Sequence, residues 1–233
     1  MLIDLKILYE DNHCLAVVKP HGLLTQGDQT GDPSLMDEVK DFIKEREKKP
    51  GNVFLGLVHR LDRPVGGIVL FAKTSKGASR LSEQFASREV EKKYLALVEG
   101  EPKIKKGVII QYLKKDHQTN IVEAFDEPVV GAQRAELVYR VLEIKQQTKP
   151  LDGTRGRETF SLIEVEPRTG RSHQIRVAMA SLGTPIVGDK KYGSHIPRGG
   201  RISLSAVELS FFQPVTKERI VLKIEPDQRE FEV

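Results

Sequence analysis

The sequence predicts an α+β fold with a central mixed, mainly antiparallel sheet and a few flanking helices. Strand-like segments outnumber segments with helical spacing, and they come in groups joined by short loops instead of alternating strictly with helices. The chain has 233 residues, enough for one sizeable domain. Its 39% hydrophobic and 30% charged residues are typical of a globular protein and exclude a disordered chain.

The first part of the chain predicts two strands and a helix. Strands are expected at 7–9 and 15–18, on either side of a turn-like Asp-Asn-His. Lys19-Pro20-His21-Gly22 then ends the strand pattern, because proline cannot continue a ladder. A helix should begin at Ser34, with Asp37 as its capping-box partner.

The next part predicts strand, strand, helix and strand. An apolar run at 53–58 ends in polar residues, and a second apolar strand follows at 67–72. Thr74 is expected to cap a helix, and strand character returns at 92–98.

The second half predicts several strands and one helix. Alternation between 108 and 144 favours strands, whereas 145–158 carries almost nothing apolar and is expected to be an exposed connection. The helix should span about 172–182 and end at Gly183 in the left-handed conformation. Further strands are expected at 159–166, 202–212 and 218–224, with a Gly-, Lys- and Arg-rich loop at 188–201.

Composition bears on the binding partner and the cellular compartment of the protein. The net charge of +4 and the pI of about 9.0 only weakly favour a nucleic-acid partner. Cys14 is the single cysteine and lies in an apolar run, so it is interpreted as a buried hydrophobic residue in a reducing compartment. No secretory signal or membrane-spanning run is apparent, so a cytoplasmic location without membrane contact is expected.

Two segments concentrate chemically useful side chains. His59-Arg60-Leu61-Asp62 directly follows an apolar run, at an expected strand end. Catalytic groups are common at such positions, although charged residues also occur wherever a strand leaves the core. Residues 167–176 place arginines, a histidine and a glutamine around a helix start, which suits anion binding. From 168 to 201 there are seven lysines and arginines but one acid, Asp189, which indicates a polyanionic partner.

Other chemistries lack their motifs in this sequence. There is no cysteine–histidine or histidine–glutamate spacing typical of zinc sites, no phosphate-binding glycine loop of the Walker or dinucleotide type, and no G-x-S-x-G elbow.

Four segments in order resemble the RluA family of pseudouridine synthases over nearly the whole chain. They are the Lys19-Pro20-x-Gly22 turn, His59-Arg60-Leu61-Asp62 with Gly67 and Ala72-Lys73, Lys92-Lys93-Tyr94-Leu95-Ala96, and Arg168 to Arg176 followed by 183–193. The resemblance implies a pseudouridine-synthase-like fold with an RNA-binding cleft across its sheet, and no cofactor or metal. The chain resembles the short members of the family, so a single catalytic domain, 1–233, without an N-terminal S4 domain is expected.

The resemblance also assigns roles to residues. Asp62 would be the catalytic aspartate, attacking sugar or base or abstracting a sugar proton, with Arg176 as its ion-pair partner. Tyr94 would stack beneath the target ring and assist proton removal. Arg60 would fill the gap left by the extracted base, and Leu204 would line the pocket. Further substrate contacts are expected from His59, Arg171, His173, Gln174 and Lys191.

The partner implied by the resemblance is RNA, either a ribosomal or a transfer RNA stem-loop. No obligatory protein partner is expected, and a monomer is the default expectation, since the sequence does not indicate the oligomeric state. The sequence departs from the family at 63–67, at Ala178, at Ser205 and at Gln213, which affects substrate details more than the reaction class. Two competing hypotheses are a non-catalytic RNA-binding protein or chaperone and a nucleoside hydrolase or glycosidase. The second would need another positioned carboxylate, and Glu83 and Glu89 look like solvated charges.

Overall fold

The computed structural model describes residues 4–48, 50–147 and 158–232. These residues form two compact units, one made of the chain up to Glu91 together with Ala206–Ile224, and one made of Lys92–Ser205 with the chain from Glu225. The described residues contain eleven strands, three α-helices and two short 3₁₀ helices, so the α+β prediction is confirmed. Whether the two units together make up one catalytic domain, as the sequence predicted, stays a prediction.

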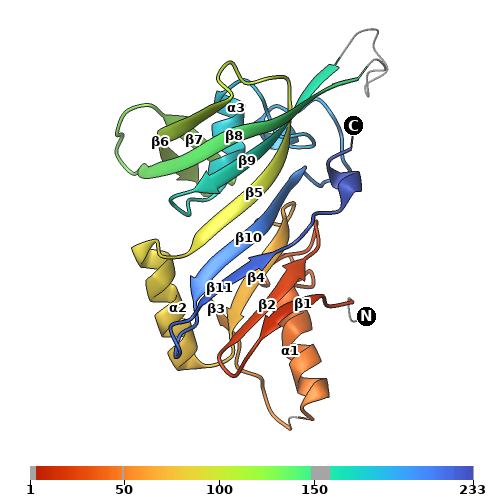
Figure 1. Cartoon of the computed structure of the whole chain (residues 1–233), viewed down its shortest axis with the longest axis vertical. Helices are drawn as coiled ribbons and strands as arrows, with labels where there is room; N and C mark the ends of the chain where they lie inside the picture. Colours follow the sequence, from red (N-terminus) through yellow and green to blue (C-terminus); the bar gives the residue numbers. More distant parts are fainter. Residues whose placement is uncertain (1–3, 49, 148–157, 233) are drawn as a thin grey trace. The chain divides into compact units, whose positions relative to one another are not determined.

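The first unit is built on a sheet with the strand order β1-β2-β4-β10, and Figure 1 shows these strands side by side. They are β1 (Ile7–Glu10), β2 (Cys14–Lys19), β4 (Gly66–Ala72) and β10 (Leu204–Phe212). β11 (Arg219–Lys223) pairs with β10, and the pairs β1–β2, β2–β4 and β10–β11 are antiparallel. The strands predicted in this unit from their apolar runs are thus confirmed, except for one.

The strand predicted at 53–58 is wrong for most of its length. Only β3 (Gly56–Leu57) pairs with the sheet, opposite Ala72 and Phe71 at the end of β4. In the sheet order, β4 lies between β2 and β10, so only a short part of its length is left for pairing with β3. The following residues, up to Val65, therefore leave the sheet as an irregular segment that carries Asp62.

Both helices of the first unit begin at the residues that the sequence predicted. α1 (Leu35–Arg46) is capped by Ser34, whose hydroxyl accepts from the backbone N–H of Asp37 at 3.3 Å and donates to the Asp37 carboxylate at 2.6 Å. α2 (Ser75–Ser87) is capped by Thr74, whose hydroxyl accepts from the N–H of Gly77 at 3.1 Å. Capping hydroxyls satisfy N–H groups that have no partner inside the helix.

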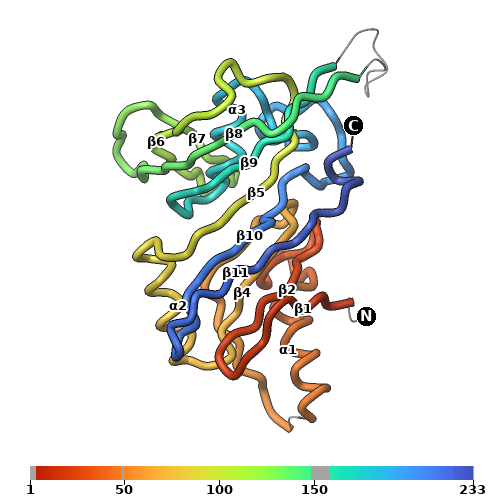
Figure 2. The backbone as a smooth tube through the Cα atoms, in the orientation of Figure 1, coloured from red at the N-terminus to blue at the C-terminus, as the bar shows by residue number. Residues whose placement is uncertain are grey.

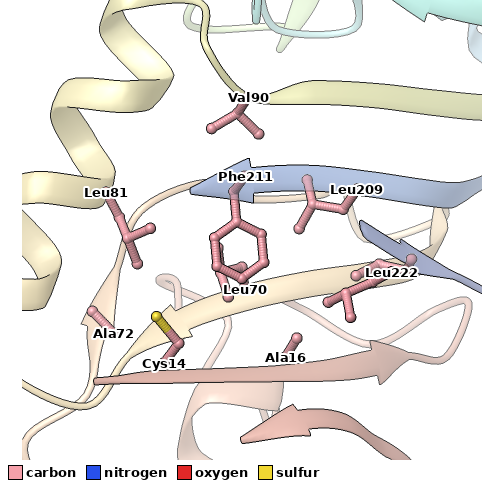
Figure 3. Close-up of a cluster of buried hydrophobic side chains, with 10 residues drawn as sticks. Cys14, Ala16, Leu70, Ala72, Leu81, Val90, Leu209, Phe211 and Leu222 are labelled. Atoms are coloured by element: carbon pink, nitrogen blue, oxygen red, sulfur yellow. The ribbon is translucent and has the colours of Figure 1, made fainter. Parts of the chain in front are cut away.

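Aliphatic and aromatic side chains from β2, β4, β10, β11 and α2 form the core of the first unit, as Figure 3 shows. Its members include Cys14, Leu70, Leu81, Phe211 and Leu222. Burial raises the pKa of the Cys14 thiol to about 12, and the negative charge of Asp11 makes a smaller contribution to this rise. The interpretation of Cys14 as a buried hydrophobic residue is confirmed.

Gly67 occupies a position that no other residue fits. Its φ is +116°, and a Cβ there would lie 2.3 Å from the carbonyl oxygen of Ala206. A side chain would therefore meet both backbone strain and a collision with the backbone of β10.

The second unit is built on an antiparallel sheet with the order β5-β9-β8-β6-β7. The strands are β5 (Glu91–Glu99), β6 (Lys106–Asp116), β7 (Ile121–Phe125), β8 (Gln133–Gln147) and β9 (Glu158–Pro167). The exposed connection predicted at 145–158 is wrong for residues 145–147 and 158, which continue the β8–β9 ladder. Backbone hydrogen bonds hold this extension of the hairpin without an apolar face. Residues 148–157 lie outside the described part.

α3 (Gln174–Ser181) contacts β6, β7 and β9, and Figure 2 shows the β6–β7 hairpin next to it. The helix is shorter than the predicted 172–182, because His173 adopts a left-handed φ of +52° that an α-helix excludes. Gly183 follows the helix with φ +76°, as predicted. The 3₁₀ helices are η1 (Lys190–Tyr192) and η2 (Gln228–Glu230). Within the described ranges, no helix is long and apolar enough to cross a membrane.

Candidate active site

Asp62 lies in the irregular segment between β3 and β4 and is half-buried. Its carbonyl accepts a hydrogen bond from the N–H of Val65 at 3.0 Å, which closes a turn just before β4. Because this segment has no strand partner, its backbone groups need other hydrogen-bonding partners.

Thr25 supplies partners for the residue that precedes Asp62. The Thr25 hydroxyl donates to the carbonyl of Leu61 at 2.7 Å and accepts from the N–H of Leu61 at 3.1 Å. Both residues are buried, with exposed fractions of 4% and 5%. Sequence reasoning missed Thr25, since nothing in its loop marks it apart from other polar residues.

Lys19 supplies a partner for the residue that follows Asp62. Its side chain is fully buried, and its Nζ donates to the carbonyls of Pro20, Leu23 and Arg63 at 3.1, 2.6 and 3.2 Å. Burial lowers the pKa of Lys19 to about 7, and the negative charge of Asp62 opposes part of this shift. The Lys-Pro turn seen in the sequence thus lies against the Asp62 segment.

His59 and Arg60 precede Asp62 in the same segment. The Nε2 atom of His59 accepts from the backbone N–H of Leu70 at 2.9 Å, and its ring stacks on Phe85 with centroids 4.8 Å apart. These contacts give His59 a structural role, and its contact with RNA stays a prediction. Arg60 is exposed, and its predicted role in replacing the extracted base stays a prediction.

Arg176, in the second unit, forms a buried ion pair with Asp189. Its Nε and Nη2 atoms donate to the two carboxylate oxygens of Asp189, each at 2.7 Å, and the two residues are 6% and 1% exposed. The guanidinium also lies over the ring of Tyr192, 5.0 Å from its centroid. The sequence contained one signal for this pair, because Asp189 is the single acid of the basic stretch 168–201.

Tyr192 connects three elements of the second unit. Its hydroxyl lies 2.6 Å from Nδ1 of His173, just before α3, and accepts from the N–H of Val122 in β7 at 3.0 Å. His173 is 9% exposed, so its side chain is largely buried. Its predicted contact with RNA stays a prediction.

Gln174 fixes the loop that carries the arginines before α3. Its carbonyl oxygen accepts from the Thr169 hydroxyl at 2.8 Å and from the N–H of Arg171 at 3.1 Å, and its amide nitrogen donates to the carbonyl of Glu136 at 2.9 Å. Because Gln174 is only 6% exposed, these contacts define a structural role for it. A direct RNA contact of Gln174 stays a prediction.

Of the cations in the basic stretch, Arg176 is buried, Arg198 is half-buried and the others are exposed. Arg176 is neutralised by Asp189, and Arg198 donates to the carbonyl of Arg229 at 3.1 Å. Five others are exposed and able to meet phosphates: Arg168, Arg171, Lys190, Lys191 and Arg201. Arg171 Nε also donates to the carbonyl of Arg134 at 3.2 Å, and Lys191 Nζ to that of Asn120 at 3.1 Å.

Tyr94 and Leu204 complete the predicted residues. Tyr94 is half-buried in β5, opposite Val165 of β9, and Leu204 is 2% exposed at the start of β10. The pairing of Asp62 with Arg176 and the stacking role of Tyr94 stay predictions. Among the residues that the structure describes, no group of three or more His, Cys, Asp or Glu could hold a metal ion.

Comparison with known proteins identifies the family. Residues 13–181 match the family described as RNA pseudouridylate synthase. The chain belongs to this family. It is therefore an RNA pseudouridine synthase, an isomerase that converts uridine in RNA to pseudouridine.

Two relatives of the synthase are similar over most of both chains. The tRNA pseudouridine synthase C of Vibrio cholerae is 33% identical over 96% of this chain and 92% of its own length. The protein of the same name from Haemophilus ducreyi is 35% identical over 97% of this chain and 93% of its own length. The solved structure of human RNA Pseudouridylate Synthase Domain Containing 4 has a TM-score of 0.75 at 24% identity, covering 97% of this chain and 90% of its own. That likeness confirms the pseudouridine-synthase fold.

Proposed function

We propose that this synthase isomerises a uridine of transfer RNA through catalysis by Asp62. One observation carries the choice of RNA: relatives at 33–35% identity over more than 90% of both chains are named tRNA pseudouridine synthase C. Ribosomal RNA is the second candidate substrate. We also propose that the synthase acts as a monomer in the cytoplasm and that both units belong to one catalytic domain.

The roles proposed for individual residues follow the family resemblance. Asp62 acts on the target nucleoside, Arg176 favours its ionised form, and Tyr94 stacks against the uracil and assists proton removal. Arg60 replaces the extracted base, and Leu204 lines the pocket. The matched residues 13–181 include all of these except Leu204.

The chemistry sets limits on what the site must supply. The bond between N1 and the sugar breaks, a bond from C5 to the same sugar carbon forms, the proton on C5 is lost, and N1 takes up a proton. No oxidant, reductant or water is consumed, so one carboxylate suffices where glycoside hydrolysis uses two. Water must be kept away from the intermediate. Glu83 and Glu89 are exposed, which removes the evident candidates for the second carboxylate of a hydrolase.

Asp62→Asn tests the proposal, because the amide keeps the shape of the side chain and removes its charge. We expect pseudouridine formation to fall by at least about a thousandfold, with RNA binding retained. Chromatography of digested RNA measures the product, with tRNA and ribosomal RNA from cells lacking the gene as substrates. Glu83→Gln, at an exposed position of α2, is the matched control.

Each outcome of this experiment discriminates between functions. Turnover retained in Asp62→Asn would refute the catalytic role, and free uracil as the product would indicate a hydrolase. Pseudouridine formed in ribosomal RNA and not in tRNA would overturn the proposed substrate.

A further inference from the structure

We propose that Thr25 is a positioning residue, whose hydroxyl holds the Asp62 segment in its reactive conformation. The inference rests on the proposed catalytic role of Asp62. Thr25 lies 37 positions before Asp62 in the sequence and belongs to none of the motifs that carry the family resemblance.

The side chain of Thr25 takes the place of a strand partner. The Leu61 backbone lies outside every strand, yet both its N–H and its carbonyl bond the Thr25 hydroxyl, at 3.1 and 2.7 Å. A hydroxyl has one donor and two acceptor positions, so a single atom satisfies both groups. Because Thr25 and Leu61 are buried, water cannot readily replace either bond.

The backbone of Thr25 is itself anchored to a helix. The first turn of α1 donates from the N–H of Leu35 to the carbonyl of Leu24 at 2.8 Å, and from the N–H of Met36 to the carbonyl of Thr25 at 3.1 Å. These N–H groups have no partner within the helix. A chain of hydrogen bonds therefore runs from α1 through Thr25 to Leu61, the residue bonded to Asp62.

The far side of Asp62 is fixed in the same manner. The carbonyl of Arg63 accepts from the N–H of Gly22 at 2.9 Å and from Nζ of Lys19 at 3.2 Å. The backbone is thus held on both sides of Asp62, which restricts the directions in which the carboxylate can point. Small misplacements of a reacting group lower rates steeply, so the loss of one anchor should affect the chemical step.

Two substitutions separate the hydroxyl from the shape of the side chain. Thr25→Val has the same shape without the hydroxyl, and Thr25→Ser keeps the hydroxyl without the methyl group. We expect the single-turnover rate on tRNA to fall about 10- to 100-fold in Thr25→Val, with the Kd for RNA unchanged, and to stay near that of the parent protein in Thr25→Ser. Rates are normalised to the folded fraction, measured by circular dichroism at the assay temperature.

Several outcomes would overturn the inference. They are an unchanged rate in Thr25→Val, equal losses in both variants, or a weakened Kd with no change in rate. Should Thr25→Val not fold, Thr25→Cys, with its weak donor, replaces it in the comparison with Thr25→Ser. Asp62→Asn is assayed in parallel. If that variant is active, the proposed function fails; if it is inactive while Thr25→Val is fully active, only the role of Thr25 fails.

Discussion

At the scale of single residues, the ion pair between Arg176 and Asp189 combines two kinds of interaction. The bidentate geometry fixes the plane of the guanidinium, and Tyr192 lies against one of its faces. A buried pair does not by itself add much stability, because both charges lose their hydration. Its effect here is to orient an arginine that is proposed to meet the catalytic carboxylate.

Asp189→Asn should destabilise the protein, because it leaves the Arg176 charge buried without a compensating carboxylate. We expect the free energy of unfolding to fall by about 3–5 kcal/mol, measured by urea denaturation. Asp126→Asn, at an exposed position, is the control and should change it by less than about 0.5 kcal/mol. Equal stabilities of the two variants would contradict the predicted cost of leaving the Arg176 charge buried without its partner.

Sequence reasoning at this scale found the segments and missed the contacts within them. The motifs predicted candidate polar residues, whose roles stay predictions, but did not predict that Arg176 and His173 both contact Tyr192. The Asp189 and Thr25 contacts could not be predicted, because each joins residues 13 or more positions apart through a bend that only the fold creates. The same limit applies to Lys19, whose burial depends on the Arg63 carbonyl 44 positions later.

At the scale of elements, Glu10 ties three pieces of the first unit together. From the end of β1, its carboxylate accepts from Arg46 of α1 at 2.7 and 2.5 Å, and from Lys73, just after β4, at 2.7 Å. The hydrogen bonds from Arg46, followed by those from Lys73, lower the pKa of Glu10 to about 2, against the opposing effect of burial.

Glu10→Gln should lower stability in a pH-dependent way. A carboxyl whose pKa is lower in the folded than in the unfolded chain adds stability above its ordinary pKa of 4.5 and loses it as the pH falls toward about 2. We expect a loss of about 1–3 kcal/mol at pH 7 that shrinks between pH 4.5 and 2, measured by urea denaturation. A constant difference across this range, or one matched by Glu83→Gln, would contradict the assigned ion pairs.

Elements were predictable where local chemistry decides them. The caps Ser34 and Thr74 and the glycine after α3 are local signals, and each was correct. The strand at 53–58 failed because its length depends on how much of the β4 edge other strands leave free. The prediction for the end of β8 was wrong for the opposite reason. Residues 145–147 lack the alternation of apolar and polar side chains typical of a strand, yet they pair with β9.

At the scale of the whole molecule, charge distribution matters more than net charge. The surplus of four positive charges is small, but the exposed cations of 168–201 are accompanied by one acid, and Arg176 already neutralises it. Arg168 also pairs with Glu166 at 3.5 Å, but this pair is exposed to solvent, and the exposed cations together suit binding to the phosphates of an RNA substrate.

Arg171→Ala and Lys191→Ala should each weaken RNA binding and its dependence on salt. Each lost phosphate contact is expected to reduce the slope of log K against log salt by about 0.7–0.9. Binding titrations at several salt concentrations measure the slope, with Lys76→Ala on α2 as an exposed control. A slope equal to that of the control variant would exclude the assigned phosphate contacts.

The enclosure of Lys19 also has a consequence for its reactivity. Its amine lies within a ring of main-chain oxygens and has no exposed surface, so an acylating reagent added to the folded protein should modify lysines on the surface and spare this one. Lys19 becomes accessible only when the turn and the Asp62 segment separate. The rate of its acylation therefore reports how often that part of the chain opens.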